Sequence, residues 1–292
     1  MFRIRIQNKK KCIWYCSAVV SFLLFLLLLG WTNHLANTQD AQQMAGRWSE
    51  KKDVAQISCF FSSKAEVTED TIQSFEYSLK NVLQEASITE TSENPSARLW
   101  VDAYSADGKI TLVNGKNTLD ANAIGIGGDF FMFHPLKLIT GSYFSGNDLM
   151  QDYCIIDQDA AWQLFGSNDV VGMTVYIGNV PHIVTGVVQR PDSRMDKAAG
   201  LNSTVVYVSY ETLSAYGTNN GINHYEIVMP NPVDEFAYSK VKEGIGIDEK
   251  NVEIVENSRR YSLPNRIKTI LAFGTRSMNG KAIIYPYWEN LA

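Results

Sequence analysis

LITGSYFSGNDLMQDYCIIDQDAAWQLFGSNDVVGMTVYIGNVPHIVTGVV, residues 138–188, consists of short apolar runs separated by glycine and polar residues. The pattern predicts strands at 173–177 and 180–188, joined by a two-residue hairpin turn at Gly178-Asn179. Glycine is favoured where the backbone needs a positive φ or where two backbones approach closely. The stretch therefore indicates a scaffold of short strands and tight turns rather than a catalytic loop.

One short helical pattern lies inside this stretch. Apolar residues predict a helix at 160–165, which Asp157 or Asp159 can cap and which Gly166 can end in the left-handed conformation. The wider region 123–216 likewise alternates short strand patterns with short helical patterns. We expect it to form one β-rich lobe.

The segment that precedes this lobe has a different pattern. Residues 54–62 predict a strand, and Thr68 can cap the amphipathic helix that follows. The apolar stripe of that helix consists of Ile72, Phe75, Leu79, Val82, Leu83 and Ala86. Alternation then predicts strands at 99–104 and 110–113, with Ala106-Asp107-Gly108 as the turn between them.

The segment after the lobe repeats the first pattern. A strand is predicted at 225–229, and Asn231-Pro232 provides a cap with proline at the first helical position. Gly244 or Gly246 can end that helix, and 252–255 predicts a further strand. The sequence therefore predicts an α+β fold, in which a β-rich lobe is inserted in a split β-α-β lobe whose two parts share one sheet.

Residues 12–31 form an uncharged run of twenty, within which residues 22–29 are all leucine or phenylalanine. A helix of this length spans about 30 Å, the thickness of a bilayer core. Five basic residues precede it: Arg3, Arg5, Lys9, Lys10 and Lys11. The positive-inside rule predicts a cytoplasmic N-terminus. A cleaved signal peptide is the alternative, which the length of the run disfavours.

These patterns divide the chain into five expected parts of a single-pass cell-membrane protein. They are a cytoplasmic tail at 1–11, a transmembrane helix at 12–31, a stalk at 32–52, an extracytoplasmic core domain at 53–262 with its inserted lobe at about 123–216, and a helix and tail returning toward the membrane at 263–292. We expect the aromatic residues of 281–292 to lie at the membrane surface or against the anchor rather than in the core.

The charge of the chain restricts its partners. The formal net charge is −5, and leaving out the five basic residues of the N-terminus leaves 21 basic against 31 acidic residues. An acidic exterior argues against binding to nucleic acid and against adhesion to anionic lipid. Membrane lipid is expected to contact the chain through its anchor helix.

Four cysteines are too few for a disulfide framework. Cys12 and Cys16 lie at the cytoplasmic edge of the predicted span, where packing is the default role and palmitoylation an alternative. Cys59 and Cys154 lie in apolar strand patterns, which favours two buried free thiols, with a disulfide as the alternative.

Motifs of catalysis and cofactor binding are absent from the sequence. It has no GxxxxGK[ST] phosphate loop, no HExxH and no GxSxG, and its four histidines, His34, His134, His182 and His224, are scattered singly. We therefore predict no catalytic, cofactor-binding or metal-binding residue, and not an enzyme. The aromatic residues Trp100, Tyr104, Phe130, Phe131 and Phe133 could line a ligand cleft, but core packing is the favoured interpretation.

An ordered series of motifs resembles a known family. The series is Gly141 to Phe144, Asp148, Asp159-Ala160-Ala161-Trp162-Gln163-Leu164-Phe165-Gly166, Val171-Gly172, Val175 to Gly178 and Ile183 to Val188. Behind an N-terminal anchor, it resembles the MacB-like periplasmic core domain of FtsX/MacB-type ABC transporter permeases. The resemblance covers the anchor and essentially the whole exterior. It implies an exterior of two α+β lobes, one inserted in the other.

The resemblance also implies a function. It predicts a non-enzymatic extracytoplasmic subunit or fragment of an ABC transporter permease, which contributes to export or to the transmission of motion across the membrane. Family permeases have three further membrane helices after this domain, which do not occur before Ala292, so we expect a partner permease chain and an ATPase. The alternative is a stand-alone membrane-anchored binding module or sensor with a small-molecule ligand.

Overall fold

The computed structural model describes residues 9–49, 53–89, 98–201, 203–271 and 281–290. The first helix, α1 (Lys9–Asn37), contains one stretch, Lys11–Asn37, whose length and apolar composition would allow it to cross a membrane. The predicted span at 12–31 lies within this helix. Because α1 continues to Asn37, the first residues of the predicted stalk are helical as well.

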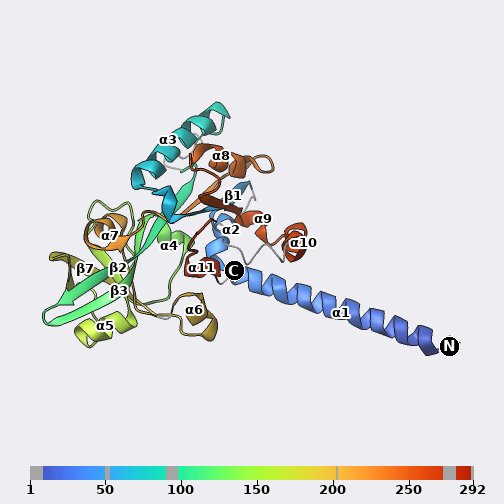
Figure 1. Ribbon diagram of the computed structural model, residues 1–292, viewed down its shortest axis with the longest axis horizontal. Helices are drawn as coiled ribbons and strands as arrows, with labels where there is room; N and C mark the ends of the chain where they lie inside the picture. The colour runs from blue at the N-terminus through green and yellow to red at the C-terminus, as the bar shows by residue number, and fades with distance from the viewer. Residues whose placement is uncertain (1–8, 50–52, 90–97, 202, 272–280, 291–292) are drawn as a thin grey trace. The chain divides into compact units, whose positions relative to one another are not determined.

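Residues Asp40–Ala292 are built around a mixed sheet (Figure 1). Along the sheet the strands follow the order β11-β1-β10-β2-β3-β8-β5-β7-β4, while β6 pairs with β2 and β7, and β9 pairs with β2. The strands are β1 (Val54–Phe61), β2 (Val101–Asn114), β3 (Asn117–Gly128), β4 (Leu138–Gly141), β5 (Tyr153–Asp157), β6 (Thr174–Ile177), β7 (Val180–Val188), β8 (Val205–Ser209), β9 (Thr218–Asn219), β10 (His224–Pro230) and β11 (Val252–Glu256).

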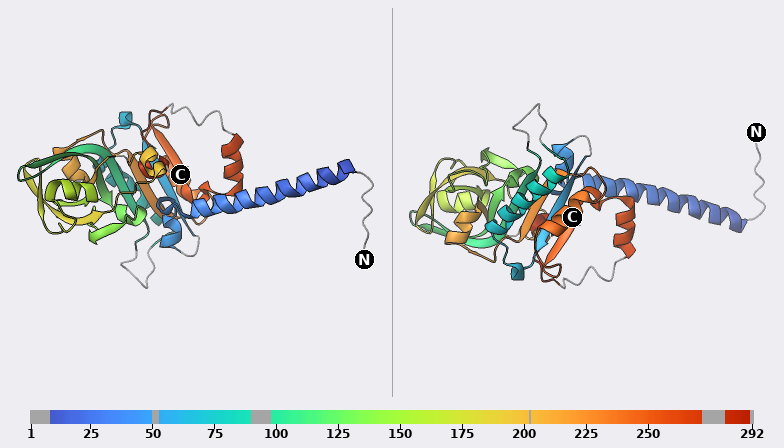
Figure 2. Two further views of the ribbon diagram at one scale, coloured as in Figure 1. Left: turned by 90° about the horizontal axis from the view of Figure 1, so that it is seen from below. Right: turned by 90° about the horizontal axis from the view of Figure 1, so that it is seen from above.

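Helices cover both faces of this sheet (Figures 1 and 2). Over β1 and β10, α3 and α8 pack on one face, while α2, α4 and α11 contribute to the core on the other. Farther along, α5 and α7 pack against β3. The helices are α2 (Met44–Trp48), α3 (Glu69–Glu85), α4 (Phe130–Phe133), α5 (Gln158–Phe165), α6 (Arg194–Ala199), α7 (Tyr210–Tyr216), α8 (Phe236–Gly244), α9 (Asn257–Arg260), α10 (Leu263–Leu271) and α11 (Tyr287–Asn290), with 3-10 turns η1 (Asp40–Gln42) and η2 (Ser63–Ala65).

The two ends of the core sequence meet in one sheet, as the sequence predicts. Strand β1 pairs antiparallel with both β10 and β11, and β10 pairs antiparallel with β2. The β-rich part between them extends the same sheet through the hairpin of β2 and β3, since β3 pairs parallel with β8. The α+β class with an inserted β-rich lobe is confirmed, and the lobes are joined by continuous strand pairing.

The predicted turn at 106–108 is wrong. Strand β2 runs straight through these residues, and the chain reverses at Gly115-Lys116 instead. A Cβ atom on Gly108 would lie 2.3 Å from the Thr218 carbonyl oxygen and 3.0 Å from Leu213 Cδ1. Gly108 is therefore needed because α7 and β9 approach the strand closely, and not because the chain turns there.

The start of α8 also differs from the prediction. The helix begins at Phe236, because Glu235 before it has a φ of 65° and interrupts any helix from Pro232. Asn231 nevertheless caps the helix from a distance: its Oδ1 accepts a hydrogen bond of 3.0 Å from the Ala237 amide. The side chain thus has the predicted role at a different backbone position.

Local signals elsewhere agree with the structure. Asp157 Oδ1 accepts a hydrogen bond from the Ala160 amide at 2.8 Å and caps α5, which Gly166 ends with a φ of 72°. Gly178 and Asn179 have φ values of 57° and 67°, as a type I′ hairpin turn requires.

Residues 281–290 pack on the sheet, which corrects the prediction that they lie apart from the core. Ile283 forms a β-bridge with Ser62, and Trp288 is only 5% exposed within the core of α4 and β10. Arg260 and Glu289 form a two-bonded ion pair of 2.8 and 2.5 Å. Aromatic side chains suit an interface with lipid, but they fill a protein core equally well. The helix predicted within 263–292 corresponds to α10 (Leu263–Leu271), and residues 272–280 lie outside the described residues.

The burial of the indole leads to a stability prediction. Trp288→Ala should destabilise the domain by about 3–5 kcal/mol, because it removes a large buried side chain and leaves a cavity. Trp162→Ala is the matched control, since Trp162 is 59% exposed on α5. Urea unfolding of the full chain in mild detergent measures both. Equal, small effects of the two substitutions would contradict the packing of the tail.

Candidate functional site

A carboxylate is buried on the third strand from the β11 edge of the sheet. Glu226 lies on β10 and is 1% exposed. Ser58, directly opposite on β1, donates a hydrogen bond of 2.6 Å to Glu226 Oε1, and Asn257 donates one of 2.7 Å to Ser58 Oγ. Gln56 Nε2 lies 3.4 Å from the same carboxylate oxygen. A buried charge is tolerated only with such partners, so this network fixes the strands and α9 around Glu226.

Two histidines from distant parts of the sequence flank this carboxylate. His134, which follows α4, places Nε2 2.6 Å from Glu226 Oε2, and His224 places Nε2 3.7 Å from Glu226 Oε1. One nitrogen of each ring and one carboxylate oxygen all lie within 4.8 Å of one another. These residue types could hold a divalent transition metal.

Burial and charge set the ionisation of this group, which we call the Glu226 cluster (His134, His224 and Glu226). Burial lowers the pKa of His224 to about 4, so this imidazole is neutral near pH 7. Burial alone would raise the pKa of Glu226, but the two histidines and the Ser58 hydrogen bond outweigh it and lower the pKa below its ordinary value. The cluster thus combines an ionised carboxylate with a neutral imidazole.

Aromatic rings enclose the Glu226 cluster. Trp288 of α11 lies with its ring centroid 4.0 Å from that of His134, and Phe60 of β1 stacks on His224 at 5.0 Å. Phe130 lies 4.6 Å from His134. All three cluster residues are at most 3% exposed, so solvent does not reach them in this conformation.

Residues 40–48, which precede β1, pack on the face of the sheet that carries the Glu226 cluster. Gln56 Oε1 accepts a hydrogen bond of 2.8 Å from the Met44 amide, and its Nε2 donates one of 2.7 Å to the Ala41 carbonyl. Arg47 donates to the carbonyl groups of Met132 and Phe133 in α4. Residues 40–48, which fall in the predicted stalk, therefore pack on the sheet.

Acidic and phenolic side chains form a second group, on the α3 face. Tyr225 donates a hydrogen bond of 2.9 Å to Asp102 Oδ2, and Tyr104 donates one of 2.8 Å to Glu69 Oε1. Burial, followed by the charge and hydrogen bond of Asp102, raises the pKa of Glu76 to about 8. Glu76 consequently keeps its proton at neutral pH.

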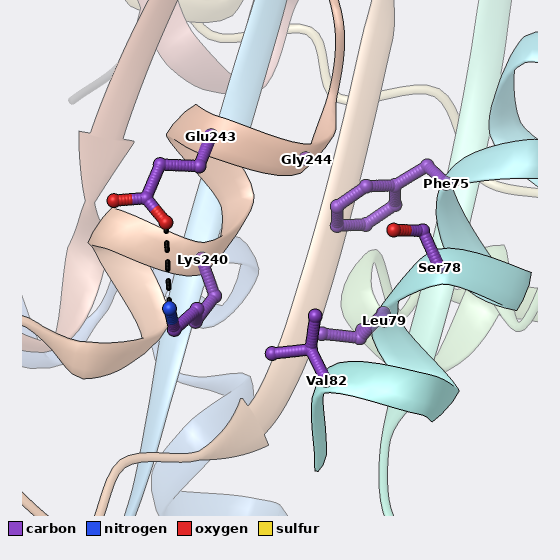
Figure 3. A pocket seen from close by; sticks show the side chains of 7 residues that line it. All are labelled: Phe75, Ser78, Leu79, Val82, Lys240, Glu243 and Gly244. Carbon is purple, nitrogen blue, oxygen red and sulfur yellow. Dashed lines mark hydrogen bonds and ion pairs between the residues drawn. The ribbon is translucent and has the colours of Figure 1, made fainter. Parts of the chain in front are cut away.

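A small cavity lies between α3 and α8. Figure 3 shows Phe75, Ser78, Leu79 and Val82 of α3 facing Lys240, Glu243 and Gly244 of α8. Its volume is about 170 Å³. A second cavity of about 310 Å³ is lined by the loop residues Ser63, Glu66, Val67, Thr68, Asn220 and Gly221. Neither is lined by a residue of the Glu226 cluster, and the first is smaller than a usual small-molecule site.

The other histidines, the cysteines and the aromatic residues considered in the sequence analysis lie in different parts of the structure. His34 is exposed on α1, and His182 is buried with Nε2 3.0 Å from Thr212 Oγ1. Cys59 and Cys154 are buried free thiols in two different core clusters. The aromatic residues proposed for a cleft are packed in the core: Tyr104, Phe130, Phe131 and Phe133 are buried, and Trp100 is partly buried.

Sequence reasoning missed the Glu226 cluster. Its one local signal is alternation: Gln56 and Ser58 on one strand, and His224 and Glu226 on another, are polar residues two positions apart among apolar neighbours. Residues two apart on a strand share a face. That signal predicts one polar face on each strand, but it does not bring in His134.

The raised pKa of Glu76 leads to a pH prediction. The folded protein holds a proton that the unfolded chain releases above about pH 4.5, so the contribution of this group is fully present below that pH and is lost as the pH rises through about 8. Wild-type protein should therefore lose stability relative to Glu76→Gln as the pH rises from about 4.5 to about 8.

The urea midpoint of the full chain across this pH range measures the difference. Glu85→Gln, at an exposed glutamate on the same helix, is the control and should follow the wild type. A Glu76→Gln variant whose midpoint runs parallel to that of the wild type would show that Glu76 does not hold its proton.

Comparison with known proteins identifies the chain's relatives. Over 99 residues it is 32% identical to the macrolide export ATP-binding/permease protein MacB of Chromobacterium violaceum, which is 33% of this chain and 15% of that protein. Identity to the MacB of Pasteurella multocida is 30% over 98 residues, 33% of this chain and 14% of that protein. The matches thus span about one seventh of the length of these relatives.

Solved structures include similar folds. The periplasmic region of MacB from Actinobacillus actinomycetemcomitans matches with a TM-score of 0.45 at 20% identity, covering 74% of this chain and 92% of that one. The extracellular domain of the noncanonic ABC-type transporter YknZ from Gram-positive bacteria matches with a TM-score of 0.43 at 18% identity, covering 68% and 99%.

The family model of the MacB-like periplasmic core domain matches residues 21–251, which begin inside α1 and end just before β11. This match includes β1 and α3, the inserted strands, β10 and α8, and with them the Glu226 cluster, but it leaves out β11. The chain belongs to the MacB-like periplasmic core domain family.

Proposed function

We propose that this chain is the anchored extracytoplasmic part of an export permease driven by a separate ATPase unit, and that it carries motion or contacts partners without chemistry of its own. The observation that carries the proposal is the family match over residues 21–251, which joins an apolar helix to the sheet domain. The core domain of a MacB-like ABC transporter permease is a transport component rather than an enzyme.

Partners are part of this proposal. The relatives are named as ATP-binding/permease proteins, and the sequence of this chain contains no phosphate-binding loop. We propose that another unit supplies ATP binding. Pore-forming membrane helices are expected from a partner permease chain or from further segments of a split permease.

The sheet suits such a role mechanically. Strand pairing continues without interruption from β11 to β4, and residues Asp40–Ala292 form one compact unit. A displacement applied at one end of a continuous hydrogen-bonded sheet is carried to the other end, because packed interiors deform little. We infer that the domain transmits motion as one body.

The proposed orientation places the N-terminus in the cytoplasm and the sheet domain outside. Leu149 is fully exposed, so Leu149→Cys, combined with Cys12→Ser and Cys16→Ser, supplies one accessible thiol. Cys59 and Cys154 are buried and should stay unreactive. A membrane-impermeant maleimide should label this variant in intact cells, and the matched chain without Leu149→Cys should stay unlabelled.

Labelling that appears only after the inner membrane is permeabilised would mean the opposite orientation. This outcome would contradict the proposed extracytoplasmic role, whatever the fold of the domain.

Co-purification tests the partnership. The full-length affinity-tagged chain, extracted from native membranes in mild detergent, should recover a protein that mass spectrometry identifies as an ABC-type ATPase, together with membrane-helix permease segments. The untagged chain, taken through the same steps, is the control. Recovery of the tagged chain alone would contradict the proposal and favour the stand-alone anchored module.

A further inference from the structure

Buried polar atoms without hydrogen-bond partners gather around Glu226. They are His134 Nδ1 and Nε2, His224 Nε2, Glu226 Oε2 and Asn257 Oδ1. Native proteins pair the great majority of such atoms, so a cluster of them indicates that a bound group completes the site. The chemistry of that group follows from the two imidazoles and the carboxylate.

The backbone brings these side chains to one point. His224 and Glu226 are two positions apart on β10, which places both on the same face of the sheet. His134 reaches them from the end of α4, where its amide donates a hydrogen bond of 2.9 Å to the Phe130 carbonyl. The candidate ligand atoms of the three residues lie within 4.8 Å of one another.

An ion pair alone does not account for this geometry. His134 Nε2 and Glu226 Oε2 form an ion pair of 2.6 Å, which still leaves His134 Nδ1 without a hydrogen-bond partner. His224 Nε2 is 3.7 Å from the other carboxylate oxygen, too far for a hydrogen bond. A proton can join His134 to Glu226, whereas a central cation would bind both imidazoles and the carboxylate together.

We propose that His134, His224 and Glu226 bind one Zn²⁺ ion, which fastens the end of α4 to β10. Two imidazole nitrogens and one carboxylate oxygen are ligands that zinc accepts in a four-coordinate site. The fourth position is left for a buried water or a neighbouring polar group.

The three side chains must shift to accept the ion. Metal–ligand bonds of about 2.0–2.2 Å place tetrahedral ligands about 3.3 Å apart, whereas the ligand atoms now lie within 4.8 Å of one another. His134 Nε2, at 2.6 Å from Glu226 Oε2, must move away from that oxygen, and His224 Nε2, at 3.7 Å from the other oxygen, Oε1, must move toward the ion.

A second layer of residues supports the ligands. Ser58 donates to Glu226 Oε1, Asn257 donates to Ser58, and Trp288 covers the ring of His134. Such outer contacts orient ligands and restrict exchange with solvent. Since the aromatic residues close the site, the ion has a structural role rather than a catalytic one, and it should be retained during purification.

The metal content of the full-length chain tests this proposal. Cells are grown with added zinc, and the chain, without a polyhistidine tag, is purified in detergent and dialysed against EDTA to remove surface metal. Elemental analysis should find about one zinc per wild-type chain, and less than about 0.1 in His224→Gln and in Glu226→Gln. X-ray absorption at the zinc edge should show two imidazole ligands.

His182→Gln is the matched control, because His182 is an equally buried histidine outside the cluster. It should keep its zinc. Folding of every variant is checked by circular dichroism, and the wild-type result remains decisive where a variant does not fold. A folded wild-type chain with less than about 0.1 zinc, or zinc retained by a folded His224→Gln variant, would overturn the proposal.

Discussion

Burial of the Glu226 carboxylate is the constraint on which much of this fold depends. An ionised carboxylate inside a sheet costs several kcal/mol unless charges and hydrogen bonds compensate it. The compensation comes from β1 through Ser58 and from the end of α4 through His134. Because these partners lie far apart in the sequence, the group is satisfied only when the segments are assembled. The Glu226 cluster therefore favours one arrangement of β1, β10 and α4, on the face of the sheet opposite α3 and α8.

Strands β1 and β10 place apolar side chains on one face of the sheet and polar side chains on the other. Odd-numbered residues such as Ile57 and Ile227 pack under α3 and α8, while Ser58 and Glu226 face α4 and α11. The hairpin of β2 and β3 then carries the same sheet into the inserted strands.

Local signals were readable from the sequence, whereas contacts over long distances were not. The cap at Asp157 and the turn at Gly178-Asn179 depend on neighbouring residues, so the sequence predicts them correctly. The role of Gly108 depends on Thr218, and the burial of Trp288 depends on the ring of His134. No short window contains these pairs. Likewise, histidines that are scattered along the chain converge only after the strands have paired.

The central claim is that residues 40–48 and 281–290 unfold together with the strands around Glu226. Native-state hydrogen exchange of the full chain tests this most directly. The account predicts that the amides of Met44 and Asn290, which donate to Gln56 and Pro286, exchange only through the same global opening as those of β10. Exchange of these amides by low-energy local opening, while β10 stays protected, would contradict it.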